Sequence, residues 1–469
     1  MDTSLLNRAW AATAGEGEAA LPGPPAPLRV TGPVGHLPSR FPVEDAAIAC
    51  VGAALLAAAA LPRQRSDREP DVAVDRAHVA AAVRSESLFR LGDRAAGPGF
   101  APLSRFWRTA DGWVRTHANY PWHRAALLRV LGVSGDADEV AAALAERRAR
   151  DVEERVFAAG GVAAAVRSFD EWGEHAQGRA LASEPLVARR TLGDAAPRRR
   201  AEADLPLAGV RVLDLTRVIA GPVCTRFLAA LGADVLRIDP PGHPDLPPGT
   251  ADTLLGKRSA FVDLASRDGL DMLHGLLAGA DVLVQGYRPA SLERFGLGFE
   301  HLAERHPGLV TVVLDAWGHS GPWSGRRGFD SIVQAASGIA AGESPDGARP
   351  GALPCQLLDH GTGYLAAAAA LDGLRRQAEL GGTHGRWLSL ARTAWWLVTA
   401  PAPPAAAHAP VRPDPDQPSW MVRLTSAQGL VTAVSPPGAI AGRALCWPDR
   451  LTDYGIDPPG WTPDPEPQS

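Results

Sequence analysis

Short apolar runs alternate with helical stretches from residue 205 to about residue 400. The runs are VRVLDL, DVLRID, SAFVDL, DVLVQGY and LVTVVLDAW, and stretches such as SRDGLDMLHGLLAGA separate them. Strands and helices that alternate in this way form βαβ units, in which the strands run parallel and helices cover both faces of the sheet. The sequence therefore predicts an α/β fold with a large, Rossmann-like parallel-sheet domain over residues 205–400.

The other parts of the chain predict further units. Residues 101–190 contain the amphipathic stretch VAAALAERRARDVEERVFAA beside short apolar runs, so we expect a smaller α+β domain there. Residues 191–204 are charged and contain proline, which is typical of an exposed linker. Residues 401–469 form a proline-rich tail with one expected hairpin, MVRLTSAQGLVTAVS.

Residues 1–100 resemble one element of the large domain. An alanine-rich helix, a polar break and a second short apolar segment follow each other over residues 42–83, and the same order recurs near the end of the large domain. Asp45 falls opposite Asp359 in this comparison, although only the second copy continues as HGTG. We expect residues 1–41 to be mostly irregular, because no apolar period is sustained in them.

Composition excludes several classes of partner. The net charge of -5 is spread along the 469 residues, which argues against nucleic acid. The four cysteines lie far apart and no HExxH spacing occurs, so we expect no disulfide, no metal site and a cytoplasmic location. The longest apolar run, Ala46–Leu61, is shorter than the roughly 20 residues that cross a bilayer. The N-terminus lacks the pattern of a signal peptide, and we expect no membrane partner.

Basic residues follow several predicted strands, where open parallel sheets bind their ligands. A group of cations there suits a polyanion, because guanidinium and ammonium groups make charge-assisted bonds to phosphate oxygens. Each cation taken alone is also consistent with a solvated surface base. The residues are Lys257, Arg258, Arg288, Arg294, Arg326 and Arg327. Lys257 is the single lysine among 47 basic residues, either through composition or because its position requires a compact ammonium.

Other familiar site patterns are absent or incomplete in the sequence. A dinucleotide site would need GxGxxG after the first strand, but Gly221 stands alone and Pro222 opens the helix, although Asp239 is suitably placed. No GxSxG motif occurs, which disfavours a serine hydrolase. Two pairs of histidines have no ligand-like partners and are interpreted as structural: His117 with His123, and His301 with His306.

Asp359 stands out in the stretch CQLLDHGTGYLAAAAALDGL, at the head of an alanine-rich helix. Aspartate is among the best helix N-caps, worth about 1 kcal/mol, and the local sequence favours that role. The alternative is a carboxylate nucleophile, with the flanking glycines allowing a substrate to approach backbone amides. Both interpretations stay open at this level.

Five segments together resemble the class III CoA-transferase family, also called the CaiB/BaiF family. In order they are PLAGVRVLDLTRVIAGPVCTRFLAALGADVLRIDPPG, GKRSAFVDL, YRPASLERFGLGFEHLAERHPGLV, GHSGPWSGRRGFDSIVQAASG and LLDHGTGYLAAAAAL. Two earlier segments, TADGWVRTHANYPWHRAALLRVLG and VRSFDEWGEHAQGRA, look like the small domain of that family. In the family this domain ordinarily follows the large-domain segment, so the domain order here looks rearranged.

The resemblance implies an activity and a set of site residues. An aspartate carboxylate would attack acyl-CoA, giving a mixed anhydride and then an aspartyl-CoA thioester, from which CoA passes to a carboxylic acid. No cofactor would be bound permanently, since the coenzyme A thioester is a substrate, and the interlaced dimers of the family imply a homodimer. By motif match Asp359 is the nucleophile, and the implied CoA-binding residues are Val218, Ile219, Lys257, Arg258, Ser291, Arg294 and Arg327.

Two further functions stay open. The related α-methylacyl-CoA racemases carry a histidine where this sequence has Phe329, which favours transfer over racemisation. His319 and His360 are candidates for a displaced base. The third possibility is a catalytically weak CoA-binding protein that retains the fold.

Overall fold

The computed structural model places most of the chain. It describes residues 3–15, 20–21, 23–61, 71–95, 99–201, 203–245, 249–289, 291–402, 420–448 and 451–463. The expected polar break after residue 61 lies largely outside these residues, as do residues 403–419 of the proline-rich tail.

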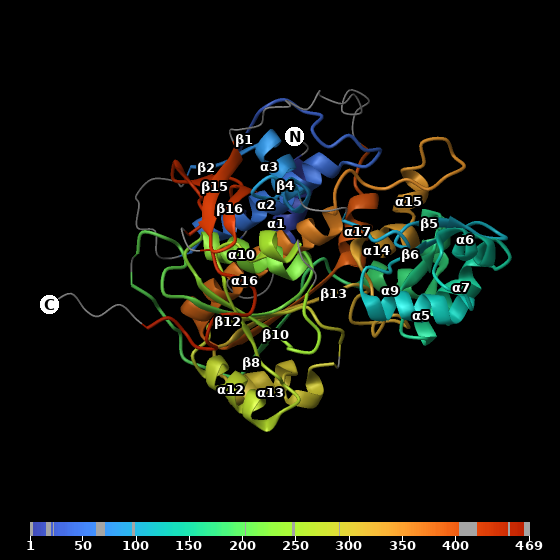
Figure 1. Ribbon diagram of the computed structural model, residues 1–469. Coiled ribbons are helices and arrows are strands. Elements are labelled where there is room, and N and C mark those ends of the chain that lie inside the picture. Colours follow the sequence, from blue (N-terminus) through green and yellow to red (C-terminus); the bar gives the residue numbers. More distant parts are fainter. Residues whose placement is uncertain are drawn as a thin grey trace.

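A seven-stranded sheet forms the centre of the molecule (Figure 1). Six strands run parallel and β8 pairs antiparallel with β14 at one edge, which confirms the predicted α/β fold. Strand β8 was not predictable from its ARRTL sequence, which has no apolar alternation. In spatial order the strands are β11 (Arg258–Phe261), β10 (Asp234–Asp239), β9 (Arg211–Leu215), β12 (Val282–Gln285), β13 (Val310–Asp315), β14 (Thr383–Ser389) and β8 (Ala188–Leu192).

Helices cover both faces of this sheet. In β12, Val282 and Val284 belong to the core that contains α10 (Ala220–Ala230) and α16 (Leu357–Leu380). Leu283 belongs to the opposite core, formed with α12 (Arg267–Ala278) and α13 (Phe299–Arg305), which lie on the other side of the sheet in Figure 1. Burial on both faces explains why these strands read as continuous apolar runs.

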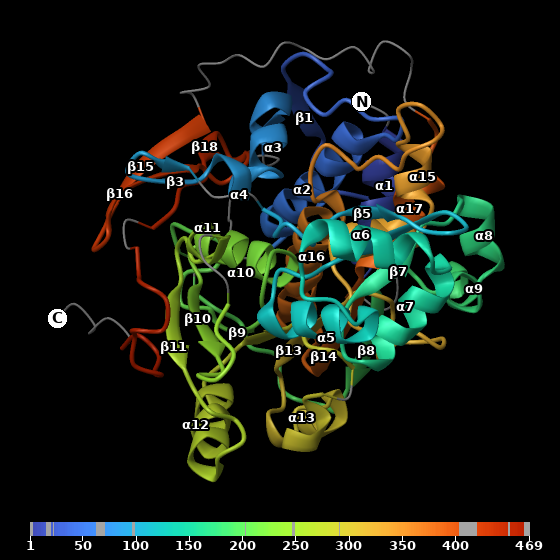
Figure 2. The same cartoon turned by 45° about the vertical axis from the view of Figure 1, so that its right-hand side comes forward.

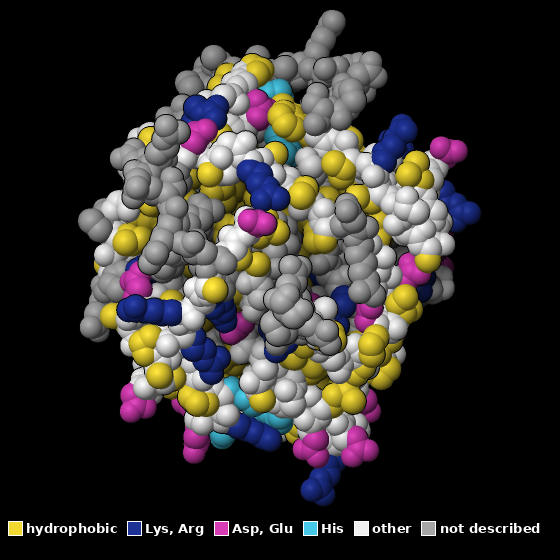
Figure 3. Space-filling model, turned by 90° about the vertical axis from the view of Figure 1, so that its left-hand side faces the viewer, with side chains coloured by type: hydrophobic (Ala, Val, Ile, Leu, Met, Phe, Trp, Pro, Cys, Tyr) yellow, Lys and Arg dark blue, Asp and Glu magenta, His cyan; other side chains and the backbone are white. Residues whose placement is uncertain are grey.

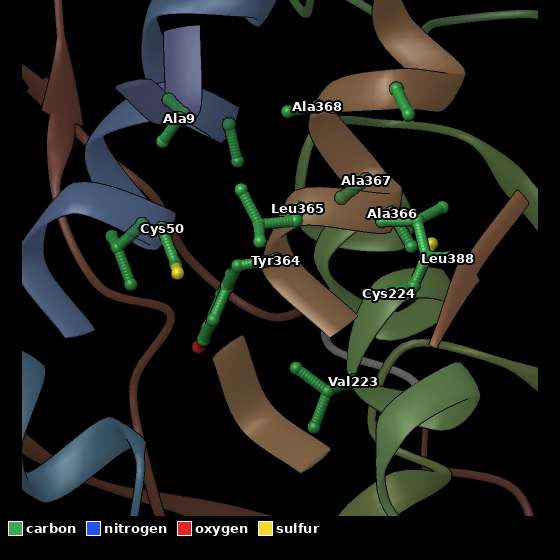
Figure 4. Close-up of a cluster of buried hydrophobic side chains, with 14 of the residues drawn as sticks. Ala9, Cys50, Val223, Cys224, Tyr364, Leu365, Ala366, Ala367, Ala368 and Leu388 are labelled. Atoms are coloured by element: carbon green, nitrogen blue, oxygen red, sulfur yellow. The ribbon is translucent and has the colours of Figure 1, made fainter. Parts of the chain in front are cut away.

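The long helix α16 lies between α10 and a helix of the N-terminal segment, α2 (Val43–Ala59). A Cβ on Gly363 would lie 2.5 Å from the carbonyl oxygen of Ala220, so this close approach requires glycine. A Cβ on Gly361 would lie 3.4 Å from Cys50 Sγ of α2. Figure 4 shows the side chains of this core. Gly363 of HGTG therefore serves helix packing, which differs from the substrate approach expected for it, whereas the 3.4 Å at Gly361 is an ordinary contact distance.

The N-terminal segment repeats the β13-α16-β14-α17 part of the large domain, where α17 is Leu390–Val398. Its elements are β1 (Leu28–Thr31), α2, β2 (Val72–Asp75) and α3 (Arg76–Ala82), and β1 pairs with β2 in parallel. Most of the described residues in 1–41 lie outside helices and strands, as expected, but α1 (Thr3–Thr13) and β1 also lie there. Helix α1 forms because Leu5, Leu6 and Trp10 bury one face in the main core.

The small domain lies to one side of the sheet (Figure 2). Its strands are β5 (Phe106–Arg108), β6 (Trp113–Thr116) and β7 (Ala163–Ala165), and its helices are α5 (Pro121–Leu131), α6 (Ala137–Ala145), α7 (Ala149–Ala158), α8 (Phe169–Glu174) and α9 (Ala176–Ser183). Helix α7 packs its apolar stripe, which includes Val152 and Val156, into a separate core of this domain.

The expected C-terminal hairpin is present as β15 (Met421–Ser426) and β16 (Gly429–Val434). Strand β16 pairs with β3 (Arg90–Leu91), which in turn pairs with β4 (Arg94–Ala95). Residues of the N-terminal segment and of the C-terminal tail therefore share a sheet. The remaining elements are α4 (Ser85–Leu88), α11 (Gly249–Thr253), the 3-10 turn Glu293–Phe295, α14 (Asp330–Ala336), α15 (Ile339–Gly342), β17 (Ala439–Ile440) and β18 (Arg443–Ala444).

The surface in Figure 3 carries basic and acidic side chains interspersed on that face. Among the residues placed by the structure, no helix is both long and apolar enough to cross a bilayer.

Candidate active site

A cavity of about 270 Å³ lies between the sheet and the small domain. Loops that follow β9, β12 and β13 line it, together with the starts of α5, α16 and α17. The cavity thus lies at the carboxyl ends of the parallel strands, where ligands of open α/β sheets bind.

Asp359 lines this cavity from the third position of α16. The helix N-cap is Gln356, which makes no side-chain capping bond, so the capping interpretation of Asp359 is wrong. The backbone N–H of Asp359 donates to Asp330 Oδ2 over 3.0 Å. The Asp359 side chain does not cap the helix. It lines the cavity, and 7% of the residue's surface is exposed.

The electrostatic surroundings of Asp359 disfavour its charged form. Burial raises the pKa of Asp359 well above its ordinary value, and the nearby carboxylates of Asp330 and Glu86 raise it further. In the described part of the chain no ion pair is made by Asp359. The N-terminus of α16 favours the ionised form and partly opposes this effect. An ionised Asp359 is therefore strongly basic and poorly solvated, which increases its reactivity as a nucleophile.

The two carboxylates that act on Asp359 come from different parts of the chain. Asp330 is buried at the start of α14 and accepts from the amide of Gln334, and burial raises its pKa to about 6. Glu86 lies on α4 of the N-terminal segment, and its Oε2 is 2.9 Å from Nε2 of the fully buried His360. The site thus depends on a residue from the first quarter of the chain.

Val218 holds an unusual backbone conformation beside the cavity. Its φ is +68°, a value that a β-branched residue rarely adopts, and its N–H donates to Asp245 Oδ2 over 3.1 Å. Strain of this kind persists where surrounding contacts impose it, and it concentrates at binding sites.

Four of the eight expected site residues meet at the cavity: Val218, Ser291, Arg327 and Asp359. The other four are Ile219, Lys257, Arg258 and Arg294, which are not part of its lining. Ile219 packs against the main core instead.

Lys257 lies inside the protein. Its ammonium is 2.9 Å from Asp214 Oδ2 and 3.0 Å from the carbonyl oxygen of Pro222, and neither charged side chain is exposed to solvent. The lone lysine thus ties β9 to the first turn of α10, behind the cavity wall. A compact ammonium with rotatable donors suits that narrow position.

Arg258 and Arg294 also lie away from the cavity. Arg258 forms a bidentate ion pair with Asp234 at 2.9 and 3.0 Å. Arg294 is exposed on a 3-10 turn, with its guanidinium 4.5 Å from the centre of the Phe295 ring.

The cavity contains cations that differ in how they are paired. Arg326 is bonded to Glu154 at 2.9 and 2.7 Å and stacks on Trp323. Arg327 and Arg288 make no ion pair within the described residues, and burial together with repulsion from Arg288 lowers the pKa of Arg327. Two uncompensated guanidinium groups at one opening are well suited to an anionic ligand.

The small domain contributes an aromatic wall that the sequence did not predict. Tyr120, Trp122 and His123 line the cavity opposite the sheet, next to Phe329 of the large domain. The rings of His123 and Phe329 are 5.8 Å apart, and His117 stacks on Phe329 at 3.7 Å without reaching the cavity. The structural interpretation of His123 is therefore incomplete. The aromatic content of THANYPWH was the signal for this wall.

Neither candidate for a displaced base lines the cavity. His319 is 44% exposed and lies 3.5 Å from Glu184, while His360 is fully buried against Glu86. Within the described ranges no cluster of three or more His, Cys, Asp or Glu side chains is arranged to hold a metal ion.

The N-terminal copy has an acid at the same helix position, and a cation pairs with it. Asp45 is the third residue of α2, as Asp359 is of α16. Arg76, the first residue of α3, lies 3.3 Å from Asp45, whereas the first residue of α17 is Leu390, which lines the cavity beside Asp359.

Comparison with known proteins agrees with this geometry. Residues 207–425 match the model of CoA-transferase family III, and this range contains Asp359 and the strand-end loops of the cavity. The chain carries a CoA-transferase family III domain. The small domain and the N-terminal copy precede the matched residues.

Several relatives of the family III domain are named for CoA transfer. An acyl-CoA transferase of Gibberella moniliformis is 32% identical over 337 residues, which cover 66% of this chain and 58% of that protein. The human succinyl-CoA:glutarate CoA-transferase is 36% identical over 191 residues, covering 38% of this chain and 43% of that protein. A crystal structure of a CaiB/BaiF family protein from Brucella suis is 25% identical with a TM-score of 0.39, covering 49% of this chain and 65% of that one. The chain thus spans about half the length of the curated relatives that it matches.

Proposed function

We propose that this protein transfers CoA from an acyl-CoA to a carboxylic acid through a covalent intermediate on Asp359. The observation that carries the proposal is the setting of Asp359, a carboxylate without an ion pair among the described residues that faces a cavity at the carboxyl edge of the sheet. Arg288 and Arg327 at the same cavity supply positive charge for the phosphates of CoA.

The proposed reaction balances without an added cofactor. An oxygen of ionised Asp359 attacks the thioester carbonyl carbon, and CoA leaves as a thiolate, which gives a mixed anhydride. The thiolate then attacks the side-chain carbonyl of Asp359, forming the aspartyl-CoA thioester and releasing the first acid. The incoming carboxylate attacks this thioester to form a second anhydride, and the returning thiolate takes the new acyl group and restores Asp359.

The features around Asp359 support a nucleophilic role over proton exchange. A base that removes a proton α to a thioester would need to face the cavity. Phe329 occupies the place of the racemase histidine, and His123, which does line the cavity, is a weak base because burial and nearby arginines lower its pKa to about 4. His319 and His360 are held by Glu184 and Glu86. The acyl group and the acceptor acid are those that fit between the aromatic wall and Asp359. The homodimer that the resemblance implies stays a prediction.

The proposal is tested by trapping and by a matched pair of variants. Hydroxylamine added during turnover should convert Asp359 to a hydroxamate, detected by peptide mass spectrometry. Asp359→Asn should abolish transfer, whereas Asp45→Asn at the equivalent position of α2 should retain it. Full activity of Asp359→Asn, or a hydroxamate elsewhere, would overturn the assignment. Deuterium uptake at the α-carbon would indicate racemisation instead, and CoA binding with neither reaction would indicate a binding protein.

A further inference from the structure

His123 brings an imidazole from the small domain to the candidate active site. It is the third residue of α5, a helix that Pro121 opens, and only 4% of its surface is exposed. What remains exposed lines the cavity that Asp359 also lines. The rings of Tyr120, Trp122 and Phe329 surround the imidazole at centroid distances of 5.5, 5.9 and 5.8 Å. The orientation of the ring is therefore set by packing on several sides.

This imidazole has a ring nitrogen without a hydrogen-bond partner within the described part of the chain. Nδ1 of His123 is buried without a hydrogen-bond partner among the described residues. A buried polar atom without a hydrogen-bond partner lowers the stability of the fold by about 1–3 kcal/mol, so its presence calls for a structural or functional explanation. His117 has an equally orphaned Nδ1 but does not line the cavity. His123 differs from it in having access to a ligand.

The charge state of His123 suits a hydrogen-bond donor. Burial and, to a lesser extent, the positive charges of Arg327 and Arg217 together lower its pKa to about 4, so the imidazole is neutral near pH 7. A neutral imidazole carries one N–H. Protonation at Nε2 leaves the buried Nδ1 as an acceptor, which avoids an orphaned buried donor. A neutral, oriented imidazole can polarise a carbonyl group.

We propose that His123 is a second catalytic residue, whose imidazole N–H donates to the acyl oxygen of the thioester when Asp359 attacks it. This step rests on the function proposed above. As the new C–O bond forms, the π electrons of the carbonyl move to its oxygen, where His123 holds the developing negative charge without transferring a proton. Collapse of the adduct expels the CoA thiolate and restores the carbonyl of the mixed anhydride.

The donor role distinguishes His123 from a residue that only shapes the wall. A ring without N–H would fill the same space between Tyr120, Trp122 and Phe329 but leave the oxyanion unsatisfied. Removal of one such donor typically lowers the rate of the chemical step by about 10²–10³-fold. Binding of the CoA moiety, which the arginines contact, should change little.

The test measures the release of CoA thiol in a single turnover, for the full chain with acetyl-CoA and a free acid. His123→Phe should slow thiol release by about 10²-fold or more with a CoA affinity within threefold of the unchanged protein, and His123→Gln, which retains an N–H, should recover at least tenfold. His117→Leu is the matched control and should stay within about fivefold. Circular dichroism confirms folding, and His123→Leu replaces the Phe variant if the latter does not fold.

Three results would overturn the inference: release by the His123 variants within threefold of the unchanged protein, a loss that lies wholly in CoA affinity, or an equal loss in His117→Leu. Failure of the proposed function gives a different pattern, because no hydroxamate would then form on Asp359 in any variant.

Discussion

The guanidinium of Arg76 lies 3.3 Å from the carboxylate of Asp45 and 2.8 Å from that of Glu44. Asp45 and Asp359 occupy the same position of two corresponding helices, and Leu390 occupies the position of Arg76 in the second copy. The residue at this helix start therefore differs between the two copies. The first acid is paired with a cation and the second faces a cavity.

Arg76→Leu should lower the stability of the protein without affecting catalysis. The change removes the guanidinium bonded to Glu44 and Asp45, and because their side chains are 12% and 24% exposed the expected loss is about 2–3 kcal/mol, somewhat below that of a fully buried pair. Urea unfolding measures it, and Arg76→Lys should lose less because it keeps the charge. A loss under about 0.5 kcal/mol would show that solvent already compensates these acids.

Glu86→Gln should move the acid limb of the pH–rate profile to lower pH. Transfer requires ionised Asp359, so the rate falls as pH falls through its pKa, which Glu86 raises by charge repulsion. Glutamine removes the charge and keeps an acceptor for His360. The profile of kcat/KM between pH 4 and 9 measures the shift, with the exposed Glu304→Gln of α13 as control. An unchanged limb would mean that Glu86 does not act on the essential ionisation.

Lys257→Ala should destabilise the fold more than it weakens binding of CoA. Its ammonium is fully buried against Asp214, so its removal leaves an unpaired buried charge and costs about 3–5 kcal/mol. The double variant Lys257→Met/Asp214→Asn removes both charges and should recover most of that loss in denaturant unfolding. A selective loss of CoA affinity in a stable Lys257→Ala protein would restore the direct role that the resemblance implies.

Arg327→Ala should weaken CoA binding by roughly tenfold or more, because a charge-assisted bond to phosphate contributes about 1.5–3 kcal/mol. Arg326→Ala is the matched control. Arg326 lines the same cavity but is occupied by Glu154, so its loss should matter less. Calorimetric titration with CoA at low and high salt compares them, and the salt dependence should shrink only for Arg327→Ala. A larger effect for Arg326 would contradict this assignment of the available cation.

The sequence predicts the parts of the site that depend on local order. The alternation of strands and helices predicts the sheet, and the repeated helix start aligns Asp45 with Asp359 at the same helical position. The aromatic wall is not predictable in this way, because Tyr120 and His123 meet Asp359 only through packing of two domains. Lys257 is a further case. The expectation that it follows a strand was wrong, because it directly precedes β11, and the burial of its side chain depends on Asp214, a residue of another strand.

The bond between His360 and Glu86 spans 274 residues of the chain. A polypeptide emerges from the ribosome N-terminus first, so Glu86, Trp122 and His123 are made before any of the parallel strands that they later face. The cavity can close only after Leu390 has been made, on the order of tens of seconds later at about 5–20 residues per second. Until then the aromatic wall lacks part of the lining that it later faces, so the proposed activity can be acquired only after Leu390 has been made.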